Sequence, residues 1–219
     1  MLESAKTRDC RLLVINPNTN PGVTRRIAEH MAQHAADATV EVVNPASGPF
    51  SIETAADRDC AVPAVLDLIR ANPGHDGYIL ACFDDIAVDE ARALVDAPVI
   101  SMAQAAIEAA AATGGPYTIV TTVEDQVPTI EALMRRYDPG QAGTVRACRV
   151  GVAAASARSA EAESLLDRHI RAAIADDGAG TVVLGSGAYV GRAGDLEKRY
   201  GIRFIEGLMA AAERLARQR

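Results

Sequence analysis

The sequence predicts an α/β fold in which two pseudo-symmetric, duplicated half-domains each contain a parallel sheet covered by helices. Short runs rich in Val, Ile and Leu alternate with Ala-rich segments along the chain, which is typical of parallel strands joined by crossover helices. The expected strand ends near residues 16, 82 and 101 recur near residues 121, 186 and 206, an offset of 104 or 105 residues each time. One order of elements repeated at one spacing indicates a duplicated unit.

The first half should contain four strands. Residues 11–16 include the apolar run Leu-Leu-Val-Ile, of the kind that a fully buried parallel strand shows. A helix should follow it, because Asn20 suits the N-cap and Pro21 the first helical position. Three further strands are expected at residues 39–43, 77–82 and 98–101.

The second half repeats this order. Its strands are expected at residues 117–121, 145–150, 181–185 and 203–205, and the helices at 102–112 and 208–217 each follow a fourth strand. We expect residues 1–101 to form the first half and residues 102–205 the second, with the C-terminal helix at about 206–219 packing back on the first. The cleft between the halves is then the expected ligand site.

Composition narrows the class of protein. The chain has 219 residues, of which 49% are hydrophobic, so it can bury a full core. The net charge of -7 and the dispersed 22 Lys and Arg residues argue against nucleic acid or a membrane surface as partner. We find neither a signal peptide nor a membrane-length apolar run, and we expect a cytoplasmic protein with a small-molecule ligand. Four cysteines without a C-x-x-C spacing suggest no disulfide framework and no metal site.

Candidate site residues lie where the predicted strands end, because ligands of open parallel sheets bind beyond the carboxyl ends of the strands. Five such residues are Asn16, Cys82, Thr121, Thr122 and Ser186. Each also has an ordinary structural explanation, since Asn clusters form turns and Thr residues begin helices.

Cys82 is the most informative of these residues. A cysteine at the end of an apolar strand is most often a small buried hydrophobe. Here a helix is expected at residues 86–95, and its N-terminus would favour the thiolate and lower the pKa of Cys82. Asp84 and Asp85 suit helix caps, while Phe83, Ile86 and Tyr189 suit either a pocket wall or the core.

Ser186 stands between two glycines, so backbone there can approach a ligand closely. The surrounding glycine spacing misses the dinucleotide-binding pattern, and it is not the serine elbow of a hydrolase. His30 and His34 are one helical turn apart, but they lack the Glu of a zinc-protease motif. We expect that pair to lie on a solvated helix face.

Several short motifs together resemble the Asp/Glu/hydantoin racemase superfamily, and within it the hydantoin and allantoin racemase branch. They are Ile15-Asn16-Pro17-Asn18-Thr19, Phe50-Ser51-Ile52-Glu53, Ala61-Val62-Pro63, Ala81-Cys82-Phe83-Asp84-Asp85, Val120-Thr121-Thr122 and Leu184-Gly185-Ser186-Gly187. The resemblance implies a cofactor-independent isomerase and a homo-oligomer. It also implies two cysteines that act as acid and base on opposite faces of a carbon acid.

Cys82 matches the first family cysteine, whereas Ser186 stands where the family usually has the second. Backbone N–H groups near Phe83, Asp84, Gly187 and Ala188, together with Asn16, Thr121 and Thr122, are the expected substrate-binding groups that hold the developing enolate. The implied substrate is a 5-substituted hydantoin, allantoin or a related amino-acid derivative. No Arg or Lys lies at these strand ends to pair a second carboxylate.

The serine leaves three explanations open. The chain is an engineered Cys-to-Ser variant, a natural one-cysteine member that protonates one face, or a racemase that relays its second proton through water. The alternative activity is an arylmalonate-type decarboxylase, for which one cysteine suffices. The alternative outside enzymes is a non-catalytic two-lobed ligand-binding module, whose mark would be an unreactive Cys82.

Overall fold

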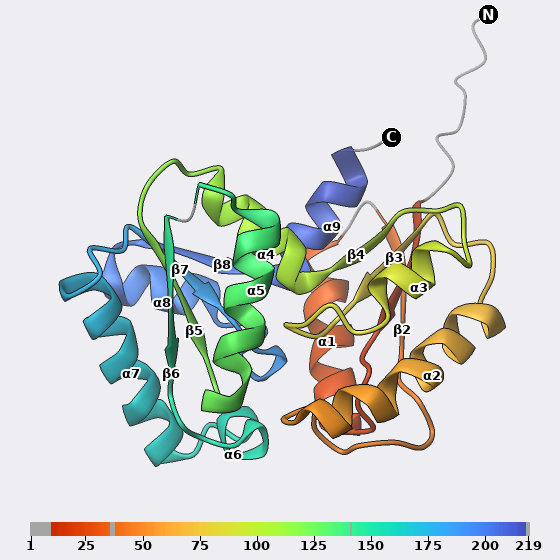
Figure 1. Cartoon of the computed structure of the whole chain (residues 1–219), viewed down its shortest axis with the longest axis horizontal. Helices are drawn as coiled ribbons and strands as arrows, with labels where there is room; N and C mark the ends of the chain where they lie inside the picture. The colour runs from red at the N-terminus through yellow and green to blue at the C-terminus, as the bar shows by residue number, and fades with distance from the viewer. Residues whose placement is uncertain (1–9, 36–37, 141, 218–219) are drawn as a thin grey trace, which may run out of the picture.

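The computed structural model describes residues 10–35, 38–140 and 142–217. They form two four-stranded parallel sheets, which lie beside each other in Figure 1. The first sheet has the order β2-β1-β3-β4, and the second has the order β6-β5-β7-β8. The two orders are the same arrangement repeated, so the predicted α/β fold with duplicated halves is confirmed.

The strands are short and almost completely buried in the middle of each sheet. Their bounds are β1 Cys10–Ile15, β2 Ala38–Val43, β3 Gly77–Leu80, β4 Val99–Ser101, β5 Tyr117–Thr121, β6 Gly143–Ala147, β7 Thr181–Leu184 and β8 Arg203–Glu206. All residues of β3, β5 and β7 are buried, as expected for parallel strands that carry helices on both faces.

Helices cover both sheets. Their bounds are α1 Pro21–His34, α2 Ala55–Ala71, α3 Val88–Arg92, α4 Met102–Ala111, α5 Val127–Tyr137, α6 Val152–Ser156, α7 Ala160–Ala175, α8 Ala193–Tyr200 and α9 Gly207–Arg217, with 3-10 turns η1 Glu124–Gln126 and η2 Gly187–Tyr189. The Asn20 side chain accepts hydrogen bonds from two backbone N–H groups at the start of α1, and it is the N-cap that the sequence predicts. None of the helices described is long and apolar enough to cross a membrane.

Five predicted boundaries, in three elements, were wrong by two or three residues. Strand β3 ends at Leu80, two residues early, because only the N–H of Ala81 still bonds to β1, at the carbonyl of Ile15. Strand β6 begins and ends two to three residues before the predicted run. The expected helix at 86–95 is only α3, because Ala87 adopts a left-handed conformation with φ of 59° that precludes an earlier start.

The terminal helices of the two halves are exchanged. Helix α4 directly follows β4 but packs on the second sheet, where Ile107 belongs to the same core cluster as Ile119 and Val183. Helix α9 follows β8 but packs on the first sheet, where Leu208 shares a cluster with Ile79. We therefore propose the division that the sequence predicts. Residues 1–101 form the first half together with α9, and residues 102–205, which include α4, form the second half.

The two exchanged helices begin beside each other, and Figure 1 shows them side by side between the sheets. A Cβ on Gly207 would lie 2.1 Å from the carbonyl oxygen of Met102. No side chain fits into that space, so only glycine permits this approach of α9 to α4. The crossing joins the two halves firmly at one end of the molecule.

Candidate active site between the two sheets

A small cavity lies where the carboxyl ends of the two sheets face each other. Its lining residues come from both halves and are Asn18, Val23, Ile52, Ala81, Cys82, Phe83, Gln126, Val152, Ser186, Gly187 and Ala188. A Cβ on Gly187 would lie 3.9 Å from the carbonyl oxygen of Ala81, which shows how closely the two strand ends approach. The predicted residues Cys82, Phe83, Ser186, Gly187 and Ala188 thus meet in one place.

Cys82 lies two residues beyond the end of β3, in a bend that follows the strand. Burial raises its pKa strongly, and the charge of Asp84 raises it further. A hydrogen bond with the backbone of Phe83 and the charge of Arg58 act in the opposite direction without overcoming burial. The expected lowering of this pKa was therefore wrong, because α3 starts only at Val88 and is too short and too distant to favour a thiolate.

Arg58 contacts this bend and connects it to the second half. Its guanidinium Nη1 lies 3.2 Å from Oδ2 of Asp84 and donates to Oγ1 of Thr129, also at 3.2 Å. Burial raises the pKa of Asp84 more than the charge of Arg58 lowers it. Arg58 thus partly offsets a carboxylate that would otherwise disfavour the thiolate of Cys82.

Asp84 and Asp85 do not cap α3, which has no side-chain cap. The Oδ1 atom of Asp84 accepts the N–H of Asp85 at 2.8 Å. Asp85 in turn accepts hydrogen bonds from the hydroxyls of Ser101 and Tyr137. These bonds fix the bend after Cys82 to the end of β4 and to α5 of the second half.

Ser186 follows β7 and is the N-cap of η2. Its Oγ accepts the N–H of Ala188 at 3.3 Å. The preceding residue is tightly packed, because a Cβ on Gly185 would lie 2.6 Å from Cγ2 of Ile119. Thr121 does not line the cavity, and its hydroxyl donates to the carbonyl of Gly185 at 2.9 Å, so it holds the strand end that carries Ser186.

The other predicted binding residues also lie behind the cavity wall. The amide nitrogen of Asn16 donates to Oδ1 of Asn18 and to Oγ1 of Thr24, at 3.0 Å each. Asn16 therefore shapes the loop that places Asn18 against the cavity. Thr122 is buried, and its carbonyl accepts the N–H of Val150 at 3.0 Å. Ile86 and Tyr189 belong to the cores, and only Phe83 of the three apolar candidates lines the cavity.

Six of the lining residues were not predicted as site residues: Asn18, Ile52 and Ala81 stand in the family motifs without a predicted role, and Val23, Gln126 and Val152 stand outside those motifs. Gln126 carries the clearest signal in hindsight, since it is a polar residue buried just before α5. Its Nε2 donates to the carbonyl of Ile52 at 2.8 Å, and the Glu53 carboxylate accepts the N–H of Val152 at 3.2 Å. Both hydrogen bonds cross from one half to the other beside Cys82 and Ser186.

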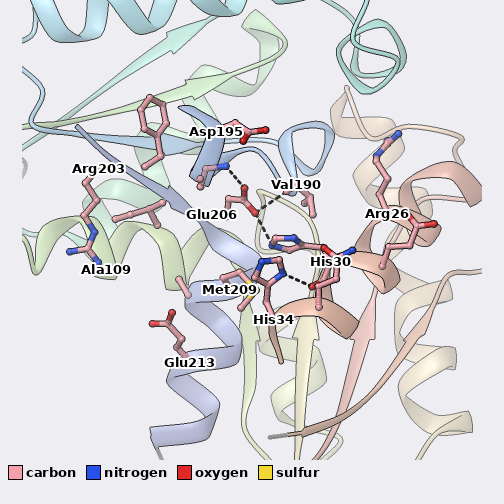
Figure 2. Close-up of a pocket in the computed structure, with 18 of the residues that line it drawn as sticks. Arg26, His30, His34, Ala109, Val190, Asp195, Arg203, Glu206, Met209 and Glu213 are labelled. Carbon is pink, nitrogen blue, oxygen red and sulfur yellow. Dashed lines mark hydrogen bonds and ion pairs between the residues drawn. The ribbon is translucent and has the colours of Figure 1, made fainter. Parts of the chain in front are cut away.

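A second and larger cavity of about 630 Å³ lies between α1, α8 and the start of α9, and Figure 2 shows its lining side chains. His30 and His34 line it together with Glu206. His30 is only 11% exposed and its Nε2 lies 3.0 Å from the Glu206 carboxylate, so the expectation of a solvated face was wrong for His30.

No group of three or more potential metal ligands occurs within residues 10–35, 38–140 and 142–217.

Comparison with known proteins identifies the class. The family model described as Asp/Glu/Hydantoin racemase matches residues 12–215. A hydantoin racemase of Rhizobium meliloti is 35% identical over 205 residues, covering 91% of this chain and 85% of its own. An allantoin racemase structure from Klebsiella pneumoniae has a TM-score of 0.87 at 33% identity, covering 95% of this chain and 86% of its own.

A second allantoin racemase structure, from Pseudomonas fluorescens, has a TM-score of 0.88 at 28% identity, covering 95% of this chain and 91% of its own. The chain belongs to the Asp/Glu/hydantoin racemase family. The family resemblance and the prediction of an enzyme are therefore confirmed, and the enzyme is a racemase, which is an isomerase.

Proposed function

We propose that this racemase acts on a cyclic ureide such as a 5-substituted hydantoin or allantoin. The observation that carries the proposal is the cavity that contains Cys82 on one side and Ser186 on the other. None of the described side chains that line it is charged, and Asn18 and Gln126 supply neutral amide groups. Such a lining suits an uncharged ring that carries N–H and C=O groups better than an amino-acid dicarboxylate.

On the first face, Cys82 removes the proton from the ring carbon that carries the substituent. The C–H electron pair moves into the ring carbonyl and forms an enolate, while the thiolate becomes a thiol. Phe83 and Ala188 line the cavity. Their backbone N–H groups, which bond to Cys82 and to Oγ of Ser186 in the structure, are the donors that we propose for the enolate oxygen. The substrate's own carbonyl accepts the charge, and we therefore propose a reaction that needs no cofactor.

On the second face, Ser186 is a far weaker acid and base than a cysteine. A thiol ordinarily titrates near 8.5, whereas the pKa of an aliphatic hydroxyl, like that of bulk water, lies far higher. We therefore expect proton transfer at Ser186 to be slow or to pass through a water molecule. The two enantiomers should therefore exchange at different rates, and the enantiomer whose C–H bond faces Cys82 should exchange its proton faster than the other.

Substrate binding also requires the cleft to open. The cavity encloses about 30 Å³, whereas small-molecule sites enclose about 300–1,000 Å³. Three contacts hold the mouth closed across the two halves: Gln126 to Ile52, Glu53 to Val152 and Arg58 to Thr129. We expect these contacts to break and re-form during each catalytic cycle.

Isotope exchange in D2O tests this function. Each pure enantiomer of a 5-substituted hydantoin and of allantoin is incubated with the protein, and deuterium at the ring carbon is followed by NMR. We expect exchange from at least one enantiomer and faster racemisation after Ser186→Cys. Absence of exchange from every enantiomer, with Ser186→Cys as well as with the native chain, would contradict the proposal.

The single thiol in the cavity also favours one second candidate, a decarboxylase of the arylmalonate type. Loss of carbon dioxide leaves an enediolate that needs only one proton donor, and Cys82 can supply that proton. Release of carbon dioxide from an arylmalonate by the native chain, abolished in Cys82→Ala, would favour this activity. A homo-oligomeric assembly, which the family resemblance implies, stays a proposal and is tested by the mass of the protein in solution.

A further inference from the structure

Glu206 anchors the segment Gly191–Ala193, which follows η2 and therefore follows Ser186. Its Oε2 accepts the N–H of Gly191 at 2.9 Å, and its Oε1 accepts the N–H groups of Arg192 and Ala193 at 2.6 Å each. Glu206 is the last residue of β8 and is buried. Three charge-assisted hydrogen bonds from consecutive residues to one buried carboxylate hold a segment in place much more firmly than neutral ones.

His30 ties the same carboxylate to the other half. Its Nε2 lies 3.0 Å from Oε2 of Glu206, and Figure 2 shows this ion pair across the second cavity. Burial raises the pKa of Glu206, but His30 and the N–H groups of Ala193 and Gly191 outweigh burial, so the pKa is lowered. The carboxylate is therefore ionised at neutral pH, with Nε2 of His30 in contact with it.

Only a short and hydrogen-bonded stretch of chain separates Ser186 from the segment that Glu206 holds. Between Ser186 and Gly191 lie only η2 and Val190, and the N–H of Tyr189 bonds to the carbonyl of Ser186 at 3.0 Å. Val190 is buried in the core cluster of the first half, next to α1. A shift of the Gly191–Ala193 segment is thus transmitted to the η2 turn that Ser186 caps.

Helix α1 connects the two ends of this arrangement. Val23 on α1 lines the small cavity, and His30 lies two helical turns further along the same helix. The carboxylate of Glu206 therefore holds η2 and the Gly191–Ala193 segment against α1, the helix whose Val23 also lines the small cavity. Ser101, the counterpart of Glu206 at the end of β4, makes a neutral hydroxyl contact to Asp85 instead.

We propose that Glu206 and His30 are positioning residues for the Ser186 face of the racemase, acting through the Gly191–Ala193 segment and η2. They do not line the small cavity that contains Cys82 and Ser186 and touch no reacting atom, and they set where residue 186 stands relative to Cys82. The proposal rests on the proposed function, because it assumes that residue 186 and Cys82 act on opposite faces of one substrate. It assigns Glu206 and His30 to the positioning of residue 186 alone. Loss of this support should slow proton transfer at residue 186 and spare proton transfer at Cys82.

The test uses the full chain with Ser186→Cys as the parent, because both faces then carry a thiol and both exchange rates are measurable. Glu206→Gln and His30→Gln are added separately, and exchange in D2O is followed from each enantiomer. We expect exchange at the residue 186 face to fall about 10- to 100-fold, as misplacement of a catalytic group by about 1 Å does. Exchange at the Cys82 face should stay within about twofold of the parent.

Glu29→Gln is the matched control, since Glu29 is exposed on the same helix and lines the same large cavity. It should change neither exchange rate. An equal fall at both faces, or no change at either face, in His30→Gln would overturn the proposal, and this variant decides the matter if Glu206→Gln fails to fold. A parent that exchanges neither enantiomer would instead contradict the proposed function.

Discussion

The two halves share one architecture but present different chemistry at the cleft. Strands β3 and β7 occupy the same place in their sheets, and the residues that follow them are Cys82 and Ser186. Each following loop also inserts an apolar side chain into the core of the opposite half, Phe83 into the second and Val190 into the first. The duplicated backbone thus determines where the two groups lie, and the side chains determine what each can do.

The supports behind the two groups differ as well. Beside Cys82, Asp84 and Arg58 place charges that act on the thiol itself. Beside Ser186, the carboxylate of Glu206, which contacts His30, acts on the backbone of the following segment and not on the hydroxyl. The charged groups of the first half therefore change the pKa of the Cys82 thiol, whereas those of the second half fix the position of the segment that follows Ser186.

The largest effect should come from removing the thiol. We expect Cys82→Ala to lower the rate of isotope exchange from the enantiomer whose C–H bond faces Cys82 by about 10²- to 10⁴-fold, the usual contribution of a general acid or base. Cys60→Ala is the control, because Cys60 is exposed on α2. A Cys82→Ala protein that retains more than a tenth of the native exchange rate would show that another group acts as the base.

The pH dependence separates the two faces next. Because the pKa of Cys82 is raised by burial, its thiol is protonated at neutral pH and the thiolate fraction grows about tenfold per pH unit below that pKa. Exchange at the Cys82 face should therefore rise about 100-fold between pH 7 and pH 9 without a plateau. Initial rates in deuterated buffers check this, and a plateau beginning near pH 7 would mean that the thiolate is already stabilised.

Replacing Arg58 should have a smaller effect with a defined rescue. Arg58→Gln removes the charge that lowers the pKa values of both Cys82 and Asp84. We expect exchange at the Cys82 face to fall about tenfold, equivalent to one pKa unit. Adding Asp84→Asn should restore part of it, because the charge of Asp84 raises the pKa of Cys82. Arg70→Gln, on the same helix and exposed, should leave the rate unchanged.

The smallest predicted effect concerns the stability of the first half. Ser101 is the N-cap of α4 and also donates to Asp85, so Ser101→Ala should lower the free energy of unfolding by about 1–2 kcal/mol. Ser159→Ala is the comparison, because Ser159 caps α7 without a second partner among the hydrogen bonds of the described residues. Urea unfolding measures both, and an equal loss would show that the Asp85 contact adds nothing.

Much of the fold was predictable because it depends on local patterns. The apolar runs at residues 11–16 and 117–121 and the repeated spacing follow directly from the order of residues. The ends of strands depend instead on where a partner strand stops, as at Leu80 beside Ile15. Such boundaries follow from pairing between distant segments and not from the local sequence.

The same distinction applies to the site. Cys82 and Ser186 were found because they stand at equivalent ends of repeated strands. Arg58 and Asp84 are 26 positions apart in the sequence, and Gln126 and Ile52 are 74 positions apart. No local pattern could therefore predict these contacts. The pKa of Cys82 was predicted in the wrong direction, because burial is a property of the folded cleft.

The ratio of exchange rates from the two enantiomers, measured by NMR in D2O for the native chain and for Ser186→Cys, tests the central claim most directly. We expect the native chain to exchange one enantiomer at least about 100-fold faster than the other, because a hydroxyl is so much weaker a base than a thiol. Ser186→Cys should bring the ratio within about tenfold of unity by accelerating only the slower enantiomer. A native ratio near unity that does not change with Ser186→Cys would contradict the assignment of the two faces to Cys82 and residue 186.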